Sequence, residues 1–226
     1  CVISGAGIDN TYNHLLSQEI AARSGYEKAR ASLEPSYAHL GVYIGLQQTA
    51  EELALPKTNF WIYPHQDFDA AVEEFIRDDD AEFPVVYISF PSAKDPDYLA
   101  RHPGTATIEI VAPAPYQRFA AWNKETWGKL PQLRGKVDYY EVSTPVSTNW
   151  FGGYQQGELY GLAHTPARMQ QRWLRTRSKI PGLWLTGQDV LTCGVTGAMM
   201  AGLLTASSVA GFRKSAALMK RIFAAS

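Results

Sequence analysis

Cysteine is scarce in this chain of 226 residues, and neither sign of charge dominates. Cys1 and Cys193 are the only cysteines, which is too few for a disulfide framework or a cysteine-rich metal site. Because 21 basic residues nearly balance 22 acidic ones, the net charge of -1 gives no attraction to nucleic acid or to an anionic membrane surface. We therefore expect no nucleic-acid partner and a reducing, intracellular compartment.

Several catalytic and targeting motifs are also missing. The five histidines include no pair four residues apart and no cysteine partner, so we expect no metal site. No G-x-S-x-G motif supports serine hydrolase chemistry, and no basic-then-apolar signal peptide opens the chain. The first residue is not Met and already fits a strand, which predicts that the numbered sequence begins inside a domain. His65 and His164 remain alternatives as acid or base, although a lone histidine is usually structural or exposed.

The opening stretch, residues 1–10, reads CVISGAGIDN and has the look of a strand entering a phosphate-binding turn. A dinucleotide fingerprint needs a third glycine where this chain has Asn10, and Asp9 puts a negative charge where phosphate would lie. Residues 11–32 have a helical pattern instead of the second strand that would carry a ribose-binding acid. The inner side of that predicted helix carries Leu15, Leu16 and Ile20. We therefore predict a buried strand over residues 1–8, then a helix, and no phosphate loop.

A series of strand-like runs follows, interrupted by one helical pattern. The runs cover residues 37–48, 59–65, 84–92 and 105–115, and DYYEVSTP (138–145) continues the series. Residues 67–80 predict a short helix, with Asp67 as its N-cap and an acidic, solvated end. This order predicts a mostly antiparallel sheet with one helix laid on it, an α+β arrangement.

The segment with the most chemical information lies near the C-terminus. An apolar strand over residues 183–186 delivers Gly187, Gln188 and Asp189 to its end, and the stretch GVTG (194–197) then opens a helix of small residues. Ligands of open α/β sheets bind at the carboxyl ends of strands, where a helix N-terminus offers free N–H groups. Asp189 could accept hydrogen bonds from sugar or ribityl hydroxyls. Alternatively, Asp189 is an N-cap and the glycines only ease packing.

Two stretches raise the question of a membrane. Residues 190–212 carry no charge over a length that could span a bilayer, yet their many Gly, Ala, Ser and Thr residues favour a helix buried in a large domain. The basic amphipathic tail over residues 213–223 could contact a membrane surface, or it could place cations at the negative end of the last helix. Peripheral membrane contact therefore stays open.

The C-terminal segment resembles a known family. PGLWLTGQDVLTCGVTGAMMAGLLTAS (181–207) is similar to the flavin-binding segment of the carotenoid isomerase, phytoene desaturase and retinol saturase family of FAD-dependent oxidoreductases, and most similar to its retinol saturase branch. The stretch YYEVSTPVSTNWFGGYQQGELYGLAHTPAR (139–168) resembles the strand and loop that precede this segment. The opening VISGAG also fits a strand of the family. The resemblance runs along nearly the whole chain.

This resemblance implies FAD as the cofactor and a polyene such as a carotenoid or retinoid as the apolar substrate. It implies that Asp189 contacts the ribityl or pyrophosphate region and that Gly187 and Gln188 line that turn. The backbone N–H groups that would meet the flavin ring belong to Val195, Thr196, Gly197 and Ala198. The residues implied near the flavin or the substrate are Thr144, Pro145, Tyr160 and Gly161. No catalytic side chain is implied.

The implied fold is an α/β flavin domain of the glutathione-reductase type plus an α+β substrate domain. Residues 1–32 would be a returning strand and helix of the flavin domain, 33–145 the substrate domain, and 146–226 the C-terminal flavin-binding segment. Two departures matter: no GxGxxG unit is present, and the resemblance implies further residues between Lys129 and Leu130 that this sequence lacks. A non-catalytic remnant that binds a lipid or a protein is therefore the alternative to an enzyme.

Overall fold

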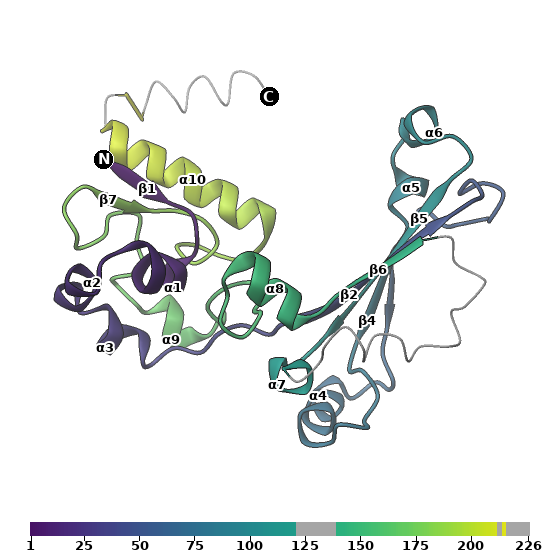
Figure 1. Ribbon diagram of the computed structural model, residues 1–226, viewed down its shortest axis with the longest axis horizontal. Coiled ribbons are helices and arrows are strands. Elements are labelled where there is room, and N and C mark those ends of the chain that lie inside the picture. The colour runs from purple at the N-terminus through teal and green to yellow at the C-terminus, as the bar shows by residue number, and fades with distance from the viewer. Residues whose placement is uncertain (121–138, 212–213, 216–226) are drawn as a thin grey trace. The chain divides into compact units, whose positions relative to one another are not determined.

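The computed structural model describes residues 1–120, 139–211 and 214–215. The chain divides into two compact units. The terminal unit combines Cys1–Ser36 with Glu158–Ser226, and the sheet unit comprises Tyr37–Gly157 (Figure 1). Residues 146–157, which the sequence grouped with the flavin segment, lie in the sheet unit.

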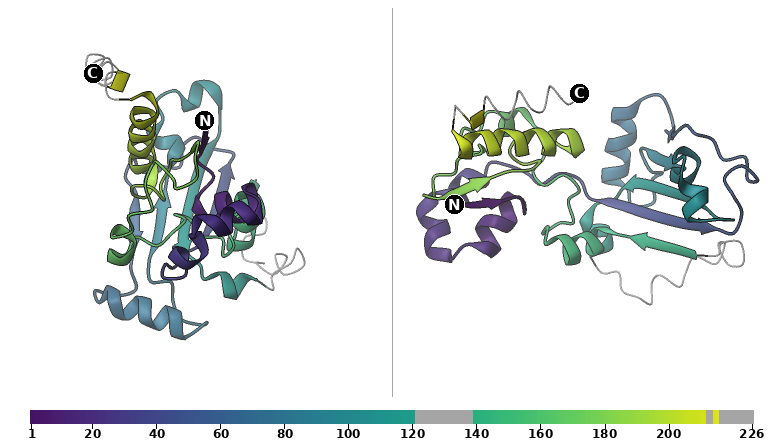
Figure 2. Two further views of the ribbon diagram at one scale, coloured as in Figure 1. Left: turned by 90° about the vertical axis from the view of Figure 1, so that its left-hand side faces the viewer. Right: turned by 90° about the horizontal axis from the view of Figure 1, so that it is seen from above.

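The terminal unit is built around a pair of parallel strands. β1 (Val2–Ser4) and β7 (Leu183–Leu185) pair with Ile3 opposite Trp184. The helical segments of this unit are α1 (Ile8–Asn10), the π-helix η1 (Thr11–Leu15), α2 (Gln18–Ser24), α3 (Tyr26–Arg30), α9 (Pro166–Met169) and α10 (Gly194–Ala210). α10 lies against β7 (Figure 2). The hydroxyl of Thr205 on α10 donates to the carbonyl of Leu185 on β7 at 2.9 Å. The strand–turn–helix predicted for the C-terminal segment is thus present.

The single helix predicted over residues 11–32 is wrong. The chain is extended at Leu16, Ser17 caps the start of α2, and Gly25 ends α2 in the left-handed region with φ 73°. The break exposes part of the predicted inner face, because the helical phase is not continuous across it, while Leu16 still packs against the core. The residues that it leaves exposed are Leu15 and Ile20.

The core of the terminal unit draws its side chains from both ends of the chain. Its buried members are Ile8, Tyr12, Ala21, Tyr26, Leu33, Leu162, Leu174, Leu183 and Leu185. Tyr12 and Tyr26 stack at 4.3 Å, and Trp173 meets Tyr26 edge-on. The core therefore joins the segment after β1 to the segments that flank β7.

The sheet unit contains a five-stranded antiparallel sheet in the order β3-β4-β5-β2-β6. Its strands are β2 (His39–Leu46), β3 (Phe60–Ile62), β4 (Val86–Ser89), β5 (Ala106–Pro113) and β6 (Tyr139–Ser143). Its helices are α4 (Phe68–Arg77), α5 (Pro91–Lys94), α6 (Tyr98–Arg101), α7 (Tyr116–Phe119) and α8 (Pro145–Gly152). The prediction of an antiparallel sheet over this part of the chain is confirmed.

Local signals in the sheet unit also act as expected. The side chain of Asp67 accepts from the backbone N–H of Ala70 and caps α4, as predicted. At the far end of α4, Arg118 lies over the ring of Phe75 and donates to the carbonyl of Asp78 at 2.8 Å. That contact places a cation at the negative end of the helix.

Some expectations fall on parts of the chain that the structure does not describe. The junction between Lys129 and Leu130 and most of the basic tail lie outside the described residues. Among the helices that are described, none has the length and hydropathy needed to cross a bilayer.

Candidate functional site

The carboxyl ends of β1 and β7 lie side by side and both lead into glycine. The N–H of Thr186 donates to the carbonyl of Ser4 at 2.9 Å, so the two strands stay paired up to Gly5 and Gly187. A side chain added at Gly187 would meet only the carbonyl of Gly5, at 3.8 Å. Strand ends without side chains leave room for a ligand to approach the backbone.

The first turn of α10 begins beyond this edge and is open to solvent. Cys193 is its N-cap residue, and the Cys193 side chain accepts no hydrogen bond from the turn. Gly194, Val195 and Thr196 are exposed, and Val195 is 86% exposed. The N–H groups of a first helical turn have no partner inside the helix, and the positive end of the helix dipole lies there. This turn can therefore bind an anion or an electron-rich ring edge.

The other two small residues predicted in this turn have different surroundings. Gly197 is buried, and a side chain there would collide with the backbone carbonyl of Thr192. Ala198 is half-buried. The absence of a side chain at position 197 therefore serves the close approach of the chain to itself.

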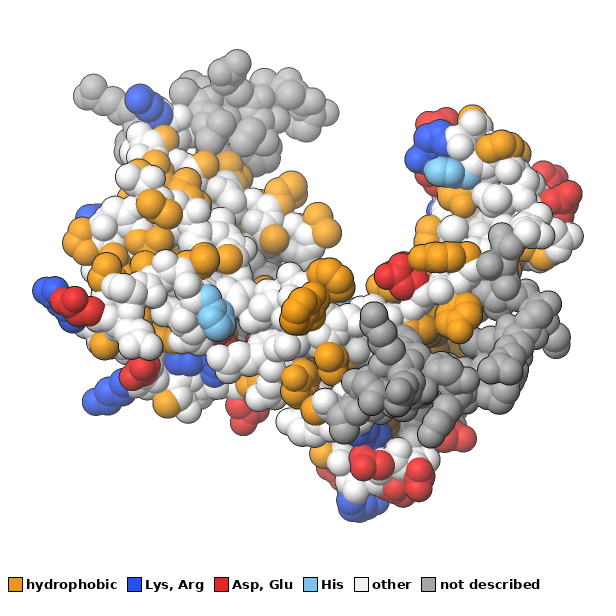
Figure 3. All heavy atoms as spheres, in the orientation of Figure 1, with side chains coloured by type: hydrophobic (Ala, Val, Ile, Leu, Met, Phe, Trp, Pro, Cys, Tyr) orange, Lys and Arg blue, Asp and Glu red, His pale blue; other side chains and the backbone are white. Residues whose placement is uncertain are grey.

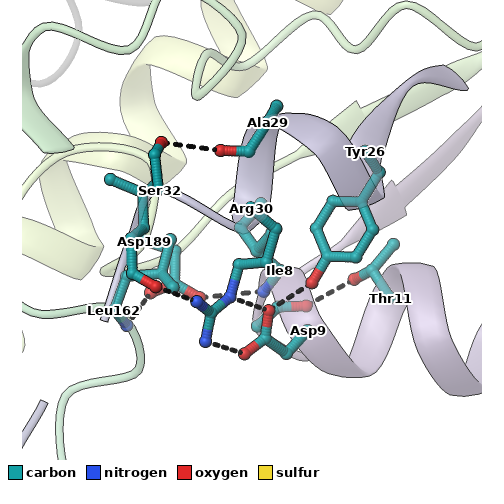
Figure 4. Close-up of polar contacts among 11 residues, drawn as sticks. Ile8, Asp9, Thr11, Tyr26, Ala29, Arg30, Ser32, Leu162 and Asp189 are labelled. Carbon is teal, nitrogen blue, oxygen red and sulfur yellow. Dashed lines mark hydrogen bonds and ion pairs between the residues drawn. The ribbon is translucent and has the colours of Figure 1, made fainter. Parts of the chain in front are cut away.

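Asp189 connects two segments that are distant in the sequence through hydrogen bonds to its carboxylate. Its carboxylate is 3% exposed and accepts from the backbone N–H of Ile8 at 2.8 Å and of Leu162 at 2.9 Å (Figure 4). The alternative that Asp189 caps α10 is wrong, because Cys193 occupies that position. The structure therefore gives this carboxylate two backbone partners, one after β1 and one in the loop before α9.

Tyr160 and Gly161 lie in that same loop. The backbone N–H of Tyr160 donates to the side-chain oxygen of Ser36 at 2.9 Å, and Tyr160 is 41% exposed. Gly161 has φ 63° and lies so close to Asp189 that any side chain would collide with the carboxylate. Gln188 contacts this loop as well, because its amide donates to the carbonyl of Leu159 at 3.4 Å. The structure thus brings together Tyr160, Gly161, Gln188 and Asp189.

Thr144 and Pro145 belong to the sheet unit, and both are buried. Thr144 forms a capping box with Ser147 at the start of α8, and Pro145 takes the first helical position. These are roles that a helix start requires. The structure describes a local structural function for the pair.

Sequence reasoning missed Arg168. This side chain is 2% exposed, and it donates to the carbonyl of Gln188 at 2.6 Å and to that of Leu162 at 3.5 Å. Burial lowers the pKa of Arg168, while the electrostatic interactions with Asp189 and Cys193 act in the opposite direction. Arginine is almost never fully buried, so the sequence alone carries no signal for this burial.

His164 lies in the same electrostatic environment. Burial and the charge of Arg168 lower its pKa, and Asp189 raises it. Its Nε2 atom is buried and has no hydrogen-bond partner among the described residues. The other histidine considered, His65, is exposed and lies 3.9 Å from Glu74.

A second polar group that the sequence did not predict supports the start of the chain. Asp9 accepts from Nε and from a terminal nitrogen of Arg30, at 2.7 and 2.8 Å, and also from the hydroxyl of Tyr26 (Figure 4). Burial and the adjacent Asp9 carboxylate raise the pKa of Tyr26. Asp9, expected to repel phosphate, is therefore the centre of an internal ion pair that joins α1 to α3.

No family model matches the chain. The curated protein "All-trans-retinol 13,14-reductase" is 34% identical in both Macaca fascicularis and Homo sapiens, over 238 residues that cover 92% of this chain. The chain is a homologue of the all-trans-retinol 13,14-reductases. This confirms the resemblance to the retinol saturase branch.

The homology has two further features. The chain spans 39% of the length of these relatives. It is also 29% identical, over the same share of each chain, to the "Inactive all-trans-retinol 13,14-reductase" of Danio rerio. Similarity to the reductases therefore comes together with similarity to a protein that is called inactive.

Proposed function

We propose that this chain is the flavin- and substrate-binding part of an FAD-dependent oxidoreductase that acts on a polyene isoprenoid, most specifically a retinoid. The observation that carries the proposal is the uncapped, exposed first turn of α10 beside the glycine ends of β1 and β7, in a homologue of retinol reductases. The names of the relatives favour saturation over desaturation or isomerisation as the reaction. The fold that would house this site is a flavin domain of the glutathione-reductase type.

The described residues fit such a cofactor. The N–H groups of Val195 and Thr196 would meet the electron-rich edge of the flavin ring, and the helix dipole there would stabilise negative charge on it. Gly187 would let the cofactor approach the backbone, and Gln188 would line the same turn. When bound, FAD supplies hydride chemistry at a carbon–carbon double bond.

Asp189 would act on the cofactor through the backbone that it holds. Both of its oxygens already accept N–H groups, from Ile8 and Leu162. Removing the carboxylate would leave two buried donors without a partner, at a cost of about 1–3 kcal/mol each. An Asp189→Ala variant would therefore lose stability along with any cofactor affinity, and it is a poor test of cofactor contact alone.

A non-catalytic binding protein is the second candidate. The observation in its favour is the homology to a protein named as an inactive reductase. Such a protein would keep the affinity for an apolar ligand and lack turnover.

Titration of the purified chain with FAD, followed by flavin fluorescence and visible absorbance, tests the proposal. We expect saturable quenching of flavin fluorescence and a perturbed flavin spectrum. Addition of all-trans-retinol under reducing, anaerobic conditions should then give a product with a shorter conjugated system. A chain that binds retinol but neither binds flavin nor changes the retinoid would support the second candidate, and one that binds neither would contradict both.

A further inference from the structure

One face of the five-stranded sheet carries a row of side chains that crosses the strands. Trp61 of β3 pairs with Tyr87 of β4, Tyr87 with Val111 of β5, and Val111 with Gly41 of β2. Directly paired residues point to the same face of a sheet, so these four positions form one line. The Trp61 and Tyr87 rings lie 4.8 Å apart, and Trp61 is 60% exposed. We call this line the apolar row.

The apolar row ends at a phenol. Tyr43 lies two residues beyond Gly41 on the same strand and the same face. A side chain built on Gly41 would meet the Tyr43 hydroxyl at 2.9 Å and its ring carbons at 3.2 Å. The Tyr43 ring therefore leans back along β2, and its hydroxyl takes the place of the missing side chain at the end of the row. This is a physical reason for a glycine in the middle of a strand, where it otherwise weakens the sheet.

Two carboxylates flank Tyr43 in the neighbouring row. Tyr43 of β2 pairs with Glu109 of β5 on one side and with Glu141 of β6 on the other. Both carboxylates therefore point to the same face as Tyr43. Burial raises the pKa of Tyr43, and both carboxylates raise it further, which keeps the phenol protonated near neutral pH. The hydroxyl of Tyr139 donates to Glu141 at 3.2 Å. The end of the apolar row is thus a cluster of hydrogen-bonding groups with negative charge.

A histidine completes the cluster. His39 lies two residues before Gly41 on the same face, beyond the hydroxyl end of Tyr43. Its Nδ1 atom is buried and has no hydrogen-bond partner among the described residues. Burial lowers the pKa of His39, while the charge of Glu109 acts against it. A neutral imidazole here can accept or donate one hydrogen bond.

The opposite face of the sheet is different in kind. The residues that alternate with those above are Phe60, Ile62, Val86, Ile88, Ile108, Ile110, Val42, Ile44, Tyr140 and Val142. Only the Tyr140 hydroxyl breaks this aliphatic and aromatic composition. The face of Tyr43 instead has an apolar row that ends in a cluster of polar groups. A ligand with an apolar body and one polar end matches this order.

We propose that the apolar row and the Tyr43 cluster form a binding site for a flat, conjugated polyene that ends in an alcohol, and that Tyr43 is its specificity-determining residue. This inference rests on the proposed function and names the substrate group that the chain recognises. The row extends over three strand spacings, about 14 Å, from Trp61 to Gly41. The polyene lies across the strands on the two rings and Val111, and its hydroxyl exchanges hydrogen bonds with the Tyr43 phenol.

Charge gives the site its selectivity. An alcohol can donate its O–H to a carboxylate and accept from the Tyr43 phenol, whereas a carboxylate ligand would be repelled by Glu109 and Glu141. A cation, Lys94, is also held on this face, where its ammonium group donates to Ser89 at 2.9 Å and to Asn59. Ser89 pairs with Glu109, so Lys94 lies on the side of Glu109 away from Tyr43. An alcohol is therefore favoured over an acid of the same polyene.

Fluorescence titrations of the purified chain with all-trans-retinol, all-trans-retinoic acid and β-carotene test this site. The wild-type chain should bind retinol about tenfold more tightly than retinoic acid at pH 7.5. Tyr43→Phe should weaken the binding of retinol about five- to tenfold. The affinity for β-carotene should stay unchanged, because a hydrocarbon makes no hydrogen bond. Glu109→Gln should strengthen the binding of retinoic acid, because it removes one of the two carboxylates that repel the ligand. Tyr37→Phe, at an exposed tyrosine outside the sheet, is the matched control.

Gly41→Ala provides an independent check, since it removes no polar group and instead displaces the Tyr43 ring. It should reproduce the loss seen in Tyr43→Phe, with circular dichroism to show that the sheet is intact. Equal retinol affinity in wild type, Tyr43→Phe and Gly41→Ala would overturn the site, as would a wild-type chain that binds no retinoid. Absence of flavin binding in the same samples, with the retinol pattern intact, would overturn the proposed oxidoreductase and leave this inference standing.

Discussion

Gly161 lies so close to Asp189 that a Cβ atom at position 161 would overlap the Asp189 carboxylate. This contact makes position 161 doubly demanding, because its backbone also has φ 63°. The loop that carries Tyr160 can approach the end of β7 only if residue 161 has no side chain. The cost of a positive φ and the cost of a steric collision can therefore be measured separately, by comparison with a glycine that has positive φ and open space around it.

Gly161→Ala should therefore lower the free energy of unfolding more than Gly182→Ala. Both positions have positive φ, for which alanine costs about 1–2 kcal/mol. Gly182 has open space around it, whereas alanine at 161 must also move the Asp189 carboxylate, for about 1–3 kcal/mol more. Urea unfolding of the two variants measures the difference. Equal losses in the free energy of unfolding would show that the loop and the Asp189 carboxylate move aside at no measurable cost.

A charge in the first turn of α10 should affect cofactor binding without harming the fold. Val195 is exposed, so Val195→Asp removes no core packing, and an acid there stabilises the helix by about 0.3–1 kcal/mol. The same charge should weaken the binding of FAD at least about tenfold, because it repels the electron-rich edge of the flavin ring and the phosphates. Val209→Asp, near the other end of α10, adds an equal charge and should leave FAD affinity unchanged. If both variants bind FAD as wild type does, the cofactor does not lie at this helix end.

The Asp9–Arg30 pair should contribute more to stability than a surface pair. Its side chains are 12% and 21% exposed, so Arg30→Met leaves a partly buried carboxylate without its cation. We expect a loss of about 2–3 kcal/mol in thermal or chemical unfolding. Arg23→Met, which breaks a pair with Glu19 at 81% exposure on both sides, should change stability by less than about 0.5 kcal/mol. Similar effects of the two substitutions would contradict the role given to the buried pair.

Stability should fall as the pH is lowered from 7 to 5. Burial lowers the pKa of His39 and His164 in the folded chain, so the unfolded chain binds protons more readily below about pH 6.5. The stability that the neutral rings provide is complete above that pH and is lost as the pH falls toward their lowered values. Unfolding at pH 7 and pH 5 of the His39→Gln/His164→Gln variant should show a smaller difference than wild type. A variant at His102, in the exposed C-cap of α6, controls for the loss of a histidine.

The sheet was predictable because its signals are local. Alternation over residues 37–48 and 105–115 predicted β2 and β5, and Asp67 predicted the start of α4. The break between η1 and α2 was not, because Leu16 and Ser17 still fit a helical pattern. Residues that meet only in the folded chain escaped in the same way: Arg30 reaches Asp9 across 21 positions, and Asp189 reaches Ile8 across 181.

The candidate site was predictable in place and less so in chemistry. The sequence indicated the end of β7 and the start of α10, and the structure places the glycine ends and the open turn there. It did not indicate that Arg168 is buried, or that Asp189 holds two backbone segments. Motif residues show where chemistry can occur, whereas their partners depend on contacts between distant segments.

Figure 3 shows hydrophobic side chains on the surface of both units. Val195 and Met199 on α10 and Trp61 in the sheet are among the exposed ones. For the sheet, the way in which they are ordered has a consequence for folding. The apolar row exists only in one pairing of the strands, because a slip of one residue between β2 and β5 would turn Tyr43 to the other face. Retinol affinity would then report whether the strands have found their native alignment, and it could be used to follow refolding or to screen variants for misaligned sheets.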